Sequence, residues 1–541
     1  MENIQLLDCT LRDGGRVIEC DFGKKKISNI LEDLQASGID IIEVGFIRDK
    51  ICYKEGTTFF TRLDQIKQYI SKPSSDIVVF VDHGMFDISA IPMRTEDNPV
   101  VGIRYGFTKG KFDVALPEMI ELKRKGYQLY VQDVNTPGYS DTEILDLIKK
   151  INTLQPYSFA IVDTYGSMYQ EDVKRYYNLF DQNLLPDIRI DFHSHNNYQL
   201  SFSHAQEIVK LAKASGRNVI IDSTLYGMGK VAGNLNTELI ADFLNRKYRF
   251  NYGITRIFDS IDENIIEYSN IYRWGYSTNA LLSGIYMSHP NNVIYLTEKF
   301  KLDTNDVGNI LSMITDEKRE TYDYDNIEEL YIQYNSSKQG DAETREKLNK
   351  IVKGRKILII APGSSIKRND KKLEEFIQKE KPVIISVNFD YGKSEDSFVF
   401  FANKKRYKEY KIASSNANII LASNVGKKDG KEMLVDYGSL VERGGKNFDN
   451  ATIMLLRLLK DMEMSDVSLA GFDGFDSSDN FVSEELELNR GYKDTKRLNS
   501  EISVMFSRIQ CEYKRRGIAL RFLTDSIYDI YSGGKTVEKE Y

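Results

Sequence analysis

The chain has 541 residues, of which 41% are hydrophobic and 28% are charged, and its formal net charge is −7. This length exceeds a single compact core and predicts roughly two to four domains. The acidic balance argues against nucleic acid as a partner, and no apolar run is long enough to cross a bilayer.

The N-terminus and the cysteines indicate the cellular compartment. The chain enters a strand-like run at once, without the charged and apolar regions of a secretory signal. Its four cysteines form no CxxC pair, which argues against a disulfide framework and a thiolate zinc site: Cys9, Cys20, Cys52 and Cys511. We therefore expect a cytoplasmic protein.

Strand-like and helix-like patterns alternate over residues 1–285. The strand-like runs cover residues 4–10, 39–46, 76–82, 100–107, 127–134, 158–164, 188–195 and 218–224. The segments between them are long enough for helices, as in KKKISNILEDLQASG, where apolar residues recur at helical spacing before Gly38. Eight such units predict a (β/α)8 TIM barrel, with an open doubly wound sheet as the alternative.

The remaining chain divides into two further segments. Residues 286–354 combine helical periodicity with a charged, tyrosine-rich stretch, which predicts a helical appendage leading into a solvated linker. Residues 355–541 again alternate short apolar strands with helices, which predicts an open, Rossmann-like α/β domain with a mostly parallel sheet.

Polar side chains gather where the predicted barrel strands end, and reactive groups of TIM barrels lie at these carboxyl ends. The set is Arg12, Asp13, Glu43, Asp82, His83, Arg104, Gln132, Asp133, Asp163, His193, His195 and Asp222. Asp133 and Asp222 would equally serve as caps of the following helices. The ring as a whole predicts an active site at this end of the barrel.

The stretch DFHSHNN is the sharpest local signal for a metal. Residues two apart in a strand face the same side, so His193 and His195 both point toward the barrel axis. Two satisfied core histidines are the alternative. Two imidazoles and one carboxylate make a facial metal site, and Asp13 is the natural third ligand. Such ligands suit Mn²⁺, with Mg²⁺, Co²⁺ or Zn²⁺ as alternatives.

A glycine-rich loop, YGMGKVAGNLNTELI, follows the eighth predicted strand. Gly227, Gly229 and Gly233 let its backbone approach a ligand closely, although a plain structural turn is the alternative. Asn234 offers an amide oxygen as a further ligand.

Four motifs in this order, TLRDGG, IEVGF, HSHNN and GMGKVAGNLNTEL, resemble those of the aldolase and acyl-CoA lyase-like TIM barrels, most closely the 4-hydroxy-2-oxovalerate aldolase branch. The resemblance covers residues 1–285. It implies that Asp13, His193 and His195 hold a divalent metal, with Asn234 as a fourth ligand. It also implies that Arg12 stabilises a developing enolate oxygen and that Glu43 orients Arg12 or a metal-bound water.

The expected activity is that of a metal-dependent aldolase, which makes or breaks a carbon–carbon bond next to a 2-oxo acid such as pyruvate, with an aldehyde as the partner. Residues expected to contact substrate are Arg16, Arg104, Gln132, Asp163 and Gly229. The branch carries a histidine base just after its Arg-Asp-Gly turn, where this chain has Gly15 and Arg16. The base is then His83, Tyr165 or Tyr139, and Arg16 binds a second anionic group of the substrate.

The C-terminal segment carries weaker signals. The turn in IIAPGSSI (359–366) places Gly363 and Ser364 where backbone amides receive an anion, and Asn388 and Asp473 follow predicted strands. The later segment GGKNFDNATIMLLRLL…VSLAGFDGF is similar to Rossmann-like domains of bacterial surface-glycan sialyltransferases. This resemblance implies a nucleotide or nucleotide-sugar ligand and a role in surface-polysaccharide synthesis.

Two other readings stay open. The same barrel would serve a Claisen-type acyl-CoA condensing enzyme or lyase. Alternatively, an inactive barrel would act as a scaffold for the C-terminal domain, but a scaffold does not need Arg12, Asp13, Glu43 and both histidines together. We also expect a homo-oligomer.

Overall fold

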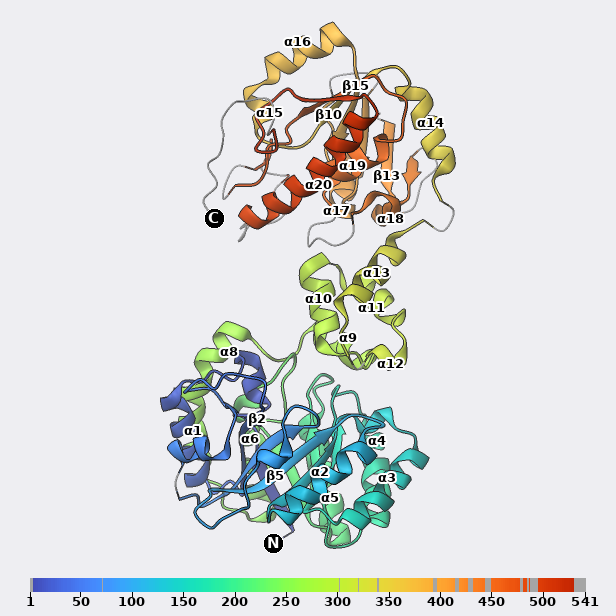
Figure 1. The fold of residues 1–541 in the computed structure, drawn as a ribbon. Coiled ribbons are helices and arrows are strands. Elements are labelled where there is room, and N and C mark those ends of the chain that lie inside the picture. The colour runs from blue at the N-terminus through green and yellow to red at the C-terminus, as the bar shows by residue number, and fades with distance from the viewer. Residues whose placement is uncertain are drawn as a thin grey trace. The chain divides into compact units, whose positions relative to one another are not determined.

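The computed structural model describes residues 3–70, 72–300, 302–319, 321–337, 340–392, 397–413, 418–426, 432–442, 449–476, 480–483, 486 and 495–529. The chain forms two compact units, Met1–Tyr324 and Asp325–Tyr541. Figure 1 shows the first unit in blue to green and the second in yellow to red.

The first unit is built on a closed parallel barrel. Its strands are β1 (Ile4–Asp8), β2 (Ile41–Ile47), β4 (Asp76–Asp82), β5 (Val100–Phe107), β6 (Gln128–Asp133), β7 (Ser158–Asp163), β8 (Arg189–Ser194) and β9 (Val219–Ser223). Pairing of β1 with both β9 and β2 closes the sheet, and the short β3 (Phe59–Phe60) adds to the β2 end. The predicted barrel is confirmed, and closure excludes the open-sheet alternative.

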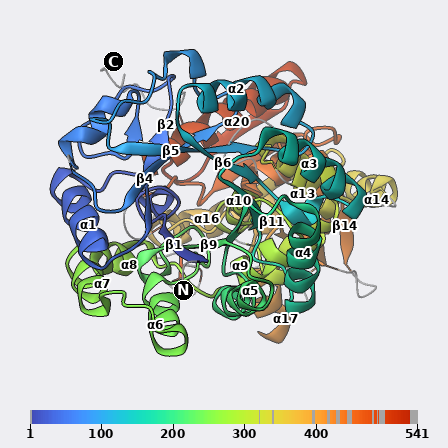
Figure 2. The same ribbon diagram turned by 90° about the horizontal axis from the view of Figure 1, so that it is seen from below.

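Helices cover the outside of the barrel, as Figure 2 shows. They are α1 (Lys24–Ala36), α2 (Phe112–Arg124), α3 (Asp141–Leu154), α4 (Gln170–Asn183), α5 (Ser201–Ser215), α6 (Thr237–Tyr248), α7 (Ile254–Ser260) and α8 (Ile266–Tyr272). β2 and β7 are buried along their whole length. Burial on both faces explains why these strands read as continuous apolar runs.

The crossovers after β2 and β4 contain no α-helix among their described residues. Their helical turns are the 3₁₀ segments Leu63–Gln68 and Ile88–Ala90, and the first crossover also contains β3. Pro92 and Pro99 fall in the second of these crossovers, and proline disfavours a continuing helix. The barrel is therefore covered less regularly on this side than the even spacing of its strands predicts.

Further helices extend the first unit beyond the barrel: α9 (Thr278–Ile285), α10 (Pro290–Phe300), α11 (Thr304–Ser312) and α12 (Asp316–Arg319). α9, α10 and α11 pack against one another. The helical character predicted for residues 286–354 is confirmed. The stretch expected to be a solvated linker forms α13 (Tyr324–Asn335) and α14 (Ala342–Val352), and the Ser337 amide donates to Asp436 at 2.7 Å within the second unit.

The second unit is an open, fully parallel sheet in the order β14-β13-β12-β11-β10-β15-β16. Its strands are β10 (Lys356–Ile360), β11 (Val383–Val387), β12 (Ser397–Phe401), β13 (Asn418–Ala422), β14 (Met433–Val435), β15 (Asp466–Ala470) and β16 (Ala519–Phe522). Its helices are α15 (Ser365–Arg368), α16 (Asp370–Glu380), α17 (Lys404–Ala413), α18 (Tyr437–Leu440), α19 (Ala451–Leu459) and α20 (Thr495–Arg515). The predicted open α/β domain is confirmed.

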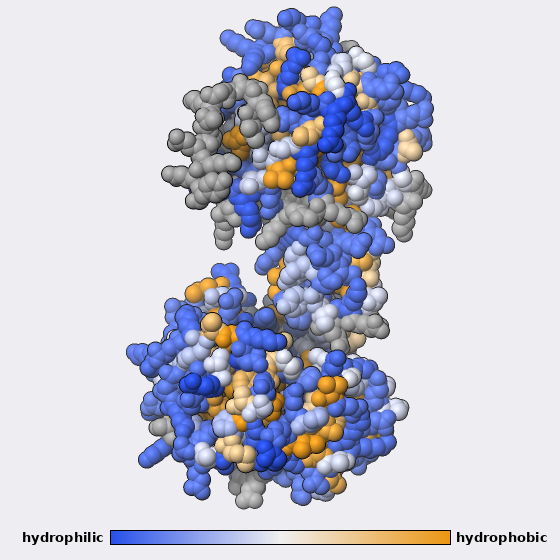
Figure 3. Space-filling view, in the orientation of Figure 1, coloured by the Kyte–Doolittle hydropathy of each residue, from blue (hydrophilic) through white to orange (hydrophobic). Residues whose placement is uncertain are grey.

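Hydrophilic side chains dominate the molecular face drawn in Figure 3, with separate apolar patches on the first unit. Within the described residues, no helix combines the length and apolar character that a membrane crossing requires.

Candidate metal centre and active site

Three side chains converge at the carboxyl end of the barrel: Asp13, just after β1, and His193 and His195, at the end of β8. One ligand atom from each lies within 4.8 Å of the others. The Asp13 Oδ2 atom is 4.0 Å from His193 Nε2 and 3.8 Å from His195 Nε2. The structure thus brings together the three residues that the sequence predicts as metal ligands.

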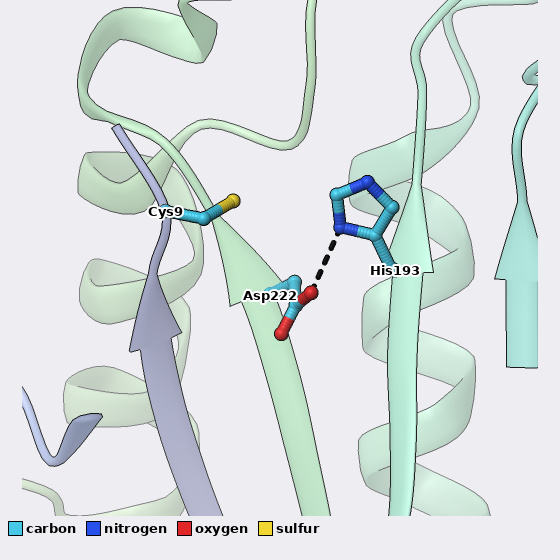
Figure 4. A group of neighbouring side chains, drawn as sticks. All are labelled: Cys9, His193 and Asp222. Atoms are coloured by element: carbon cyan, nitrogen blue, oxygen red, sulfur yellow. Dashed lines mark hydrogen bonds and ion pairs between the residues drawn. The ribbon is translucent and has the colours of Figure 1, made fainter. Parts of the chain in front are cut away.

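Asp222, at the end of β9, fixes the orientation of His193. Its Oδ2 atom lies 2.8 Å from His193 Nδ1. Figure 4 marks this contact between the two side chains with a dashed line. Because Nδ1 contacts Asp222, Nε2 is left to face Asp13 and a metal. A metal-binding imidazole usually has its second ring nitrogen hydrogen-bonded in this way. Cys9 lies near the same two side chains, but burial raises the pKa of its thiol, so the sulfur stays protonated and a poor ligand.

Arg104 lies beneath this group and is fully buried. Its guanidinium donates to Asp222, to Asp191 at 2.8 Å and, more weakly, to Glu43 at 3.5 Å. Burial raises the pKa of Asp191 well above its usual range, whereas Arg104 and His193 outweigh burial and lower the pKa of Asp222 to about 2. Asp222 is therefore the ionised partner that holds His193.

The protonation states of the converging groups suit a cation. Burial by itself would raise the pKa of Asp13, but Arg12 and the two histidines hold it well below its usual range. Burial lowers the pKa of His195 to about 4, so its imidazole is neutral at pH 7. An ionised carboxylate beside a neutral imidazole is ready to bind a metal ion without first losing a proton.

Arg12 lies beside the metal ligands and is 3% exposed. Its Nε donates to Glu43 at 2.7 Å, and its Nη1 donates to Asp13 at the same distance. The face of its guanidinium lies over the Phe80 ring, with 4.7 Å from Cζ to the ring centroid. No described residue accepts from Nη2, which leaves one buried donor for a ligand.

Asn234 joins the group from the loop after β9. A backbone bridge pairs it with His195, and its Nδ2 donates to Asp13 at 2.9 Å. Its Oδ1 is buried without a hydrogen-bond partner among the described residues. A side chain at Gly229 would meet Asn234 Nδ2 at 2.5 Å, so the glycine permits this close packing.

A cavity of about 320 Å³ opens above Asp13 and His195. Its walls come from the barrel loops, with Arg16, Lys109, Tyr165 and Lys230 among them, and from the helical extension, with His289, Pro290 and Thr321. Arg16 is partly exposed, and its Nε lies 3.4 Å from Asp13. The predicted active-site end of the barrel therefore contains an enclosed space next to the candidate metal ligands.

Three further residues predicted for the site, Gln132, Asp163 and Arg104, differ in what their side chains contact. Gln132 is buried at the end of β6, and its Oε1 has no partner in the described part of the chain. The Asp163 carboxylate accepts from the amides of Ser167 at 2.9 Å and Met168 at 3.1 Å, and so holds the loop that carries Tyr165. Arg104 reaches carboxylates beneath the centre instead of the cavity.

His83 is directed away from the cavity. Its Nδ1 lies 2.7 Å from the Tyr105 hydroxyl, and Tyr105 in turn donates to Glu118 of α2. Since Arg104 points inward, the next residue of β5 points outward. The structure thus places His83 against the outer helical layer, and Tyr139 is not among the cavity walls.

In the second unit, two of the residues predicted to bind a ligand, Gly363 and Asp473, meet at the ends of β10 and β15. Asp473 accepts from the backbone amide and hydroxyl of Ser365, at 2.7 and 2.5 Å. A side chain at Gly363 would meet the Asp473 carboxylate at 2.5 Å. A carboxylate of the protein thus faces the turn of Gly363 and Ser364, while the Asn388 side chain accepts from the Ala402 amide at 3.0 Å.

Sequence reasoning missed several residues of the site. Asp191 lies two positions before His193 in β8, so strand alternation pointed to it. Lys230 lies within the glycine-rich loop, where the sequence pattern assigns it no role. His289, Pro290 and Thr321 carried no local signal, because they come from the helical extension and reach the site only through tertiary folding.

Comparison with known proteins adds to this geometry. A family model described as HMGL-like matches residues 119–261, which include both histidines and Asn234. An oxaloacetate decarboxylase of Mycobacterium tuberculosis is 24% identical over 48% of this chain and 76% of its own length. A 4-hydroxy-2-oxovalerate aldolase of Moorella thermoacetica is 24% identical over 56% of this chain and 90% of its own.

Among solved structures, the N-terminal domain of a putative aldolase from Bacteroides vulgatus is similar, with a TM-score of 0.48 and 23% identity over 55% of this chain and 98% of that one. The family model covers the metal-ligand strand and the glycine-rich loop, and the curated relatives match about half of the chain. Within residues 119–261 of its barrel, the chain is therefore similar to the HMGL-like family.

Proposed function

We propose that the first unit is a divalent-metal-dependent enzyme that makes or breaks a carbon–carbon bond next to a 2-oxo acid such as pyruvate. The observation that carries this proposal is the convergence of Asp13, His193 and His195 beside Arg12, whose buried Nη2 has no partner among the described residues. A metal site and a free cationic donor are what an enolate needs for its charge to be neutralised.

The residues fit a metal ion. Asp13, His193 and His195 would hold it, and the buried Asn234 Oδ1, which lacks a partner among the described residues, is available as a fourth ligand. Nitrogen and oxygen donors favour Mn²⁺, with Mg²⁺, Co²⁺ and Zn²⁺ as alternatives. When bound, the ion supplies Lewis-acid polarisation of the 2-oxo acid.

Arg12 supplies the counter-charge for the enolate oxygen. Its bonds to Glu43 and Asp13 hold two edges of the guanidinium, so Nη2 is presented in a fixed direction. A donor that is already oriented and removed from water stabilises a developing charge without reorganisation. Glu43 is thus a positioning residue for Arg12, and Asp222 is one for His193.

Tyr165 is the best placed of the three predicted bases. It is 3% exposed and lines the cavity together with His195, whereas His83 faces the outer layer and Tyr139 is outside the cavity walls. We assign it the transfer of a proton to or from the substrate. The loop that carries it is held by Asp163.

The relatives support the reaction class. Oxaloacetate and 4-hydroxy-2-oxovalerate are both 2-oxo acids, and decarboxylation and aldol cleavage both break a carbon–carbon bond. The intact contacts among Arg12, Glu43, Asp13 and His193 count against an inactive scaffold. An acyl-CoA reaction on this barrel stays the alternative, and a nucleotide-sugar ligand and a role in polysaccharide synthesis stay predictions from the C-terminal resemblance.

Methyl exchange of pyruvate in deuterated water tests the proposal. The metal-loaded protein should exchange the methyl protons, followed by NMR, and Arg12→Lys should slow exchange by about 10²–10³-fold, because lysine cannot hold Glu43 and Asp13 and still present a third donor. The control is Arg124→Lys on the surface of α2, whose arginine side chain is 64% exposed. No exchange with pyruvate or other 2-oxo acids would contradict the proposal.

A further inference from the structure

The charges around the cavity are unbalanced. Among the described residues that line it, three carry cationic side chains, Arg16, Lys109 and Lys230, and one carries a carboxylate, Asp13. Asp13 is already shared between Arg12 and the candidate metal site. The cavity therefore attracts anions more strongly than a bound metal and a single carboxylate require.

Lys230 is the clearest sign of this excess. No described residue forms a hydrogen bond or an ion pair with its ammonium group, although the side chain is only partly exposed. Burial and the nearby Arg16 lower the pKa of Lys230. Two cations that share a partly buried space repel each other unless an anion lies between them. By contrast, Lys109 already binds Glu143 at 2.9 Å and the Gly138 carbonyl at 2.7 Å.

The cavity wall that the helical extension provides also favours anions. His289 and Pro290 lie at the start of α10, whose N-terminal end carries partial positive charge. His289 Nδ1 accepts from the Asn291 amide at 3.2 Å, which leaves the proton of the neutral ring on Nε2 as a donor. Among the described residues of the helical extension, those that line the cavity are His289, Pro290 and Thr321, and none of these three carries a carboxylate.

The size of the cavity leaves room beyond a three-carbon acid. Its volume of about 320 Å³ is at the lower end of the range for small-molecule sites. It equals the volume that roughly ten water molecules occupy in liquid water. Pyruvate held by Arg12 and the metal ligands would occupy the Asp13 side. The space near Arg16, Lys230 and His289 is then left for the second reactant.

We propose that this second reactant is an aldehyde with its own anionic group, a phosphate or a carboxylate, and that Arg16 and Lys230 bind that group. The inference rests on the proposed function, because it assigns the partner of the same reaction. The aldehyde carbon then faces the enolate, and the anionic end lies under His289. A neutral aldehyde leaves Lys230 without a counter-charge beside Arg16, which shares Asp13 with Arg12, and binds more weakly.

Binding and turnover are measured on the full chain loaded with Mn²⁺. Calorimetric titration uses glycerol 3-phosphate, glycerate and glycerol as unreactive probes for a phosphate, a carboxylate and a neutral group. Turnover, followed as pyruvate consumption, uses glyceraldehyde 3-phosphate, succinic semialdehyde and glyceraldehyde. The variants are Lys230→Met, Lys230→Arg and, as a control for loss of charge, Lys210→Met on α5, whose side chain is 71% exposed.

We expect one of the two anionic probes to bind at least tenfold more tightly than glycerol. The aldehyde that carries the same anionic group should have a lower KM than glyceraldehyde. Lys230→Met should weaken anion binding roughly tenfold and raise the KM of the anionic aldehyde more than that of glyceraldehyde, whereas Lys230→Arg should restore both. Lys210→Met should change neither. The stronger anionic probe identifies the group.

Two results would overturn the inference: equal affinity for glycerol and both anions, or equal losses in Lys230→Met and Lys210→Met. Its failure is distinguishable from failure of the proposed function. Pyruvate exchange without a preference for anionic aldehydes removes the subsite and keeps the enolate chemistry. Anion binding that depends on Lys230, in a protein that does not exchange pyruvate, removes the enolate chemistry and keeps the subsite.

Discussion

Asp222 shows how one residue outside the ligand set controls the candidate metal centre. Its carboxylate fixes His193 through Nδ1 and is itself held ionised by Arg104. Asp222→Asn removes the charge while keeping the shape, so we expect metal affinity to fall roughly 10–100-fold. Competition with a chelator measures this loss, and circular dichroism checks that the barrel stays folded.

Asp146→Asn provides the matched control, because Asp146 is an exposed aspartate of α3 that pairs with Lys149. Unchanged metal affinity in Asp222→Asn would show that His193 needs no second carboxylate to bind the ion. Arg12 depends on its neighbours in a similar way. Its hydrogen bonds to Glu43 and Asp13 orient the guanidinium, so that Nη2 is directed to a ligand, and Glu43 is itself fully buried.

At the scale of elements, α5 carries a buried histidine that makes the barrel sensitive to acid. His204 is 2% exposed, and its Nε2 has no hydrogen-bond partner among the described residues. Burial lowers its pKa to about 4, below the usual 6.5. Between these values the unfolded chain binds the proton and the folded chain does not, so stability is lost as pH falls from 6.5 toward 4.

We expect His204 to cost about 2 kcal/mol of stability at pH 5 relative to pH 7. His204→Leu should remove this part of the pH-dependent loss of stability. Thermal stability should then fall less on acidification than it does in the parent chain. Thermal unfolding followed at both pH values checks this. Parallel pH profiles for the two chains would show that another group, and not His204, causes the acid sensitivity.

At the scale of the whole molecule, the division at Tyr324 decides which part is needed for the proposed chemistry. All of the candidate metal ligands and cavity walls lie within Met1–Tyr324. A chain ending at Tyr324 should therefore keep metal binding and pyruvate exchange. A chain ending at residue 285, the predicted domain boundary, lacks His289, Pro290 and Thr321 and should lose preference for anionic aldehydes. Equal preference in both would show that the helical extension does not shape the site.

Much of the first unit was predictable because its signals are local. Every barrel strand lies within a few residues of its expected range, since most of its residues are buried, and β2 and β7 are buried along their whole length. β14 and β16 carry a weaker strand signal, because they are short and their residues are partly exposed. The helix-free crossovers after β2 and β4 escaped prediction because chain length alone does not distinguish a helix from 3₁₀ turns.

The candidate metal ligands could also be predicted from the sequence. The directions in which several neighbouring side chains point could not. Strand alternation put His193 and His195 on one side, and the motif after β1 supplied Asp13. Arg104 was expected to contact substrate, but its guanidinium is drawn down to Asp191 and Asp222. His83 follows a strand end as expected, yet its ring turns outward to Tyr105.

The eight-stranded barrel, the open second sheet and the Asp-His-His set could all be predicted from local patterns, because periodicity and motif spacing are properties of neighbouring residues. The support and the closure of that set depend instead on tertiary packing. Asp222 and Arg104 act on His193 across separate strands, and the helical extension brings His289 over the cavity from nearly a hundred residues beyond β8. Contacts between segments so distant along the chain depend on packing, which no local pattern encodes.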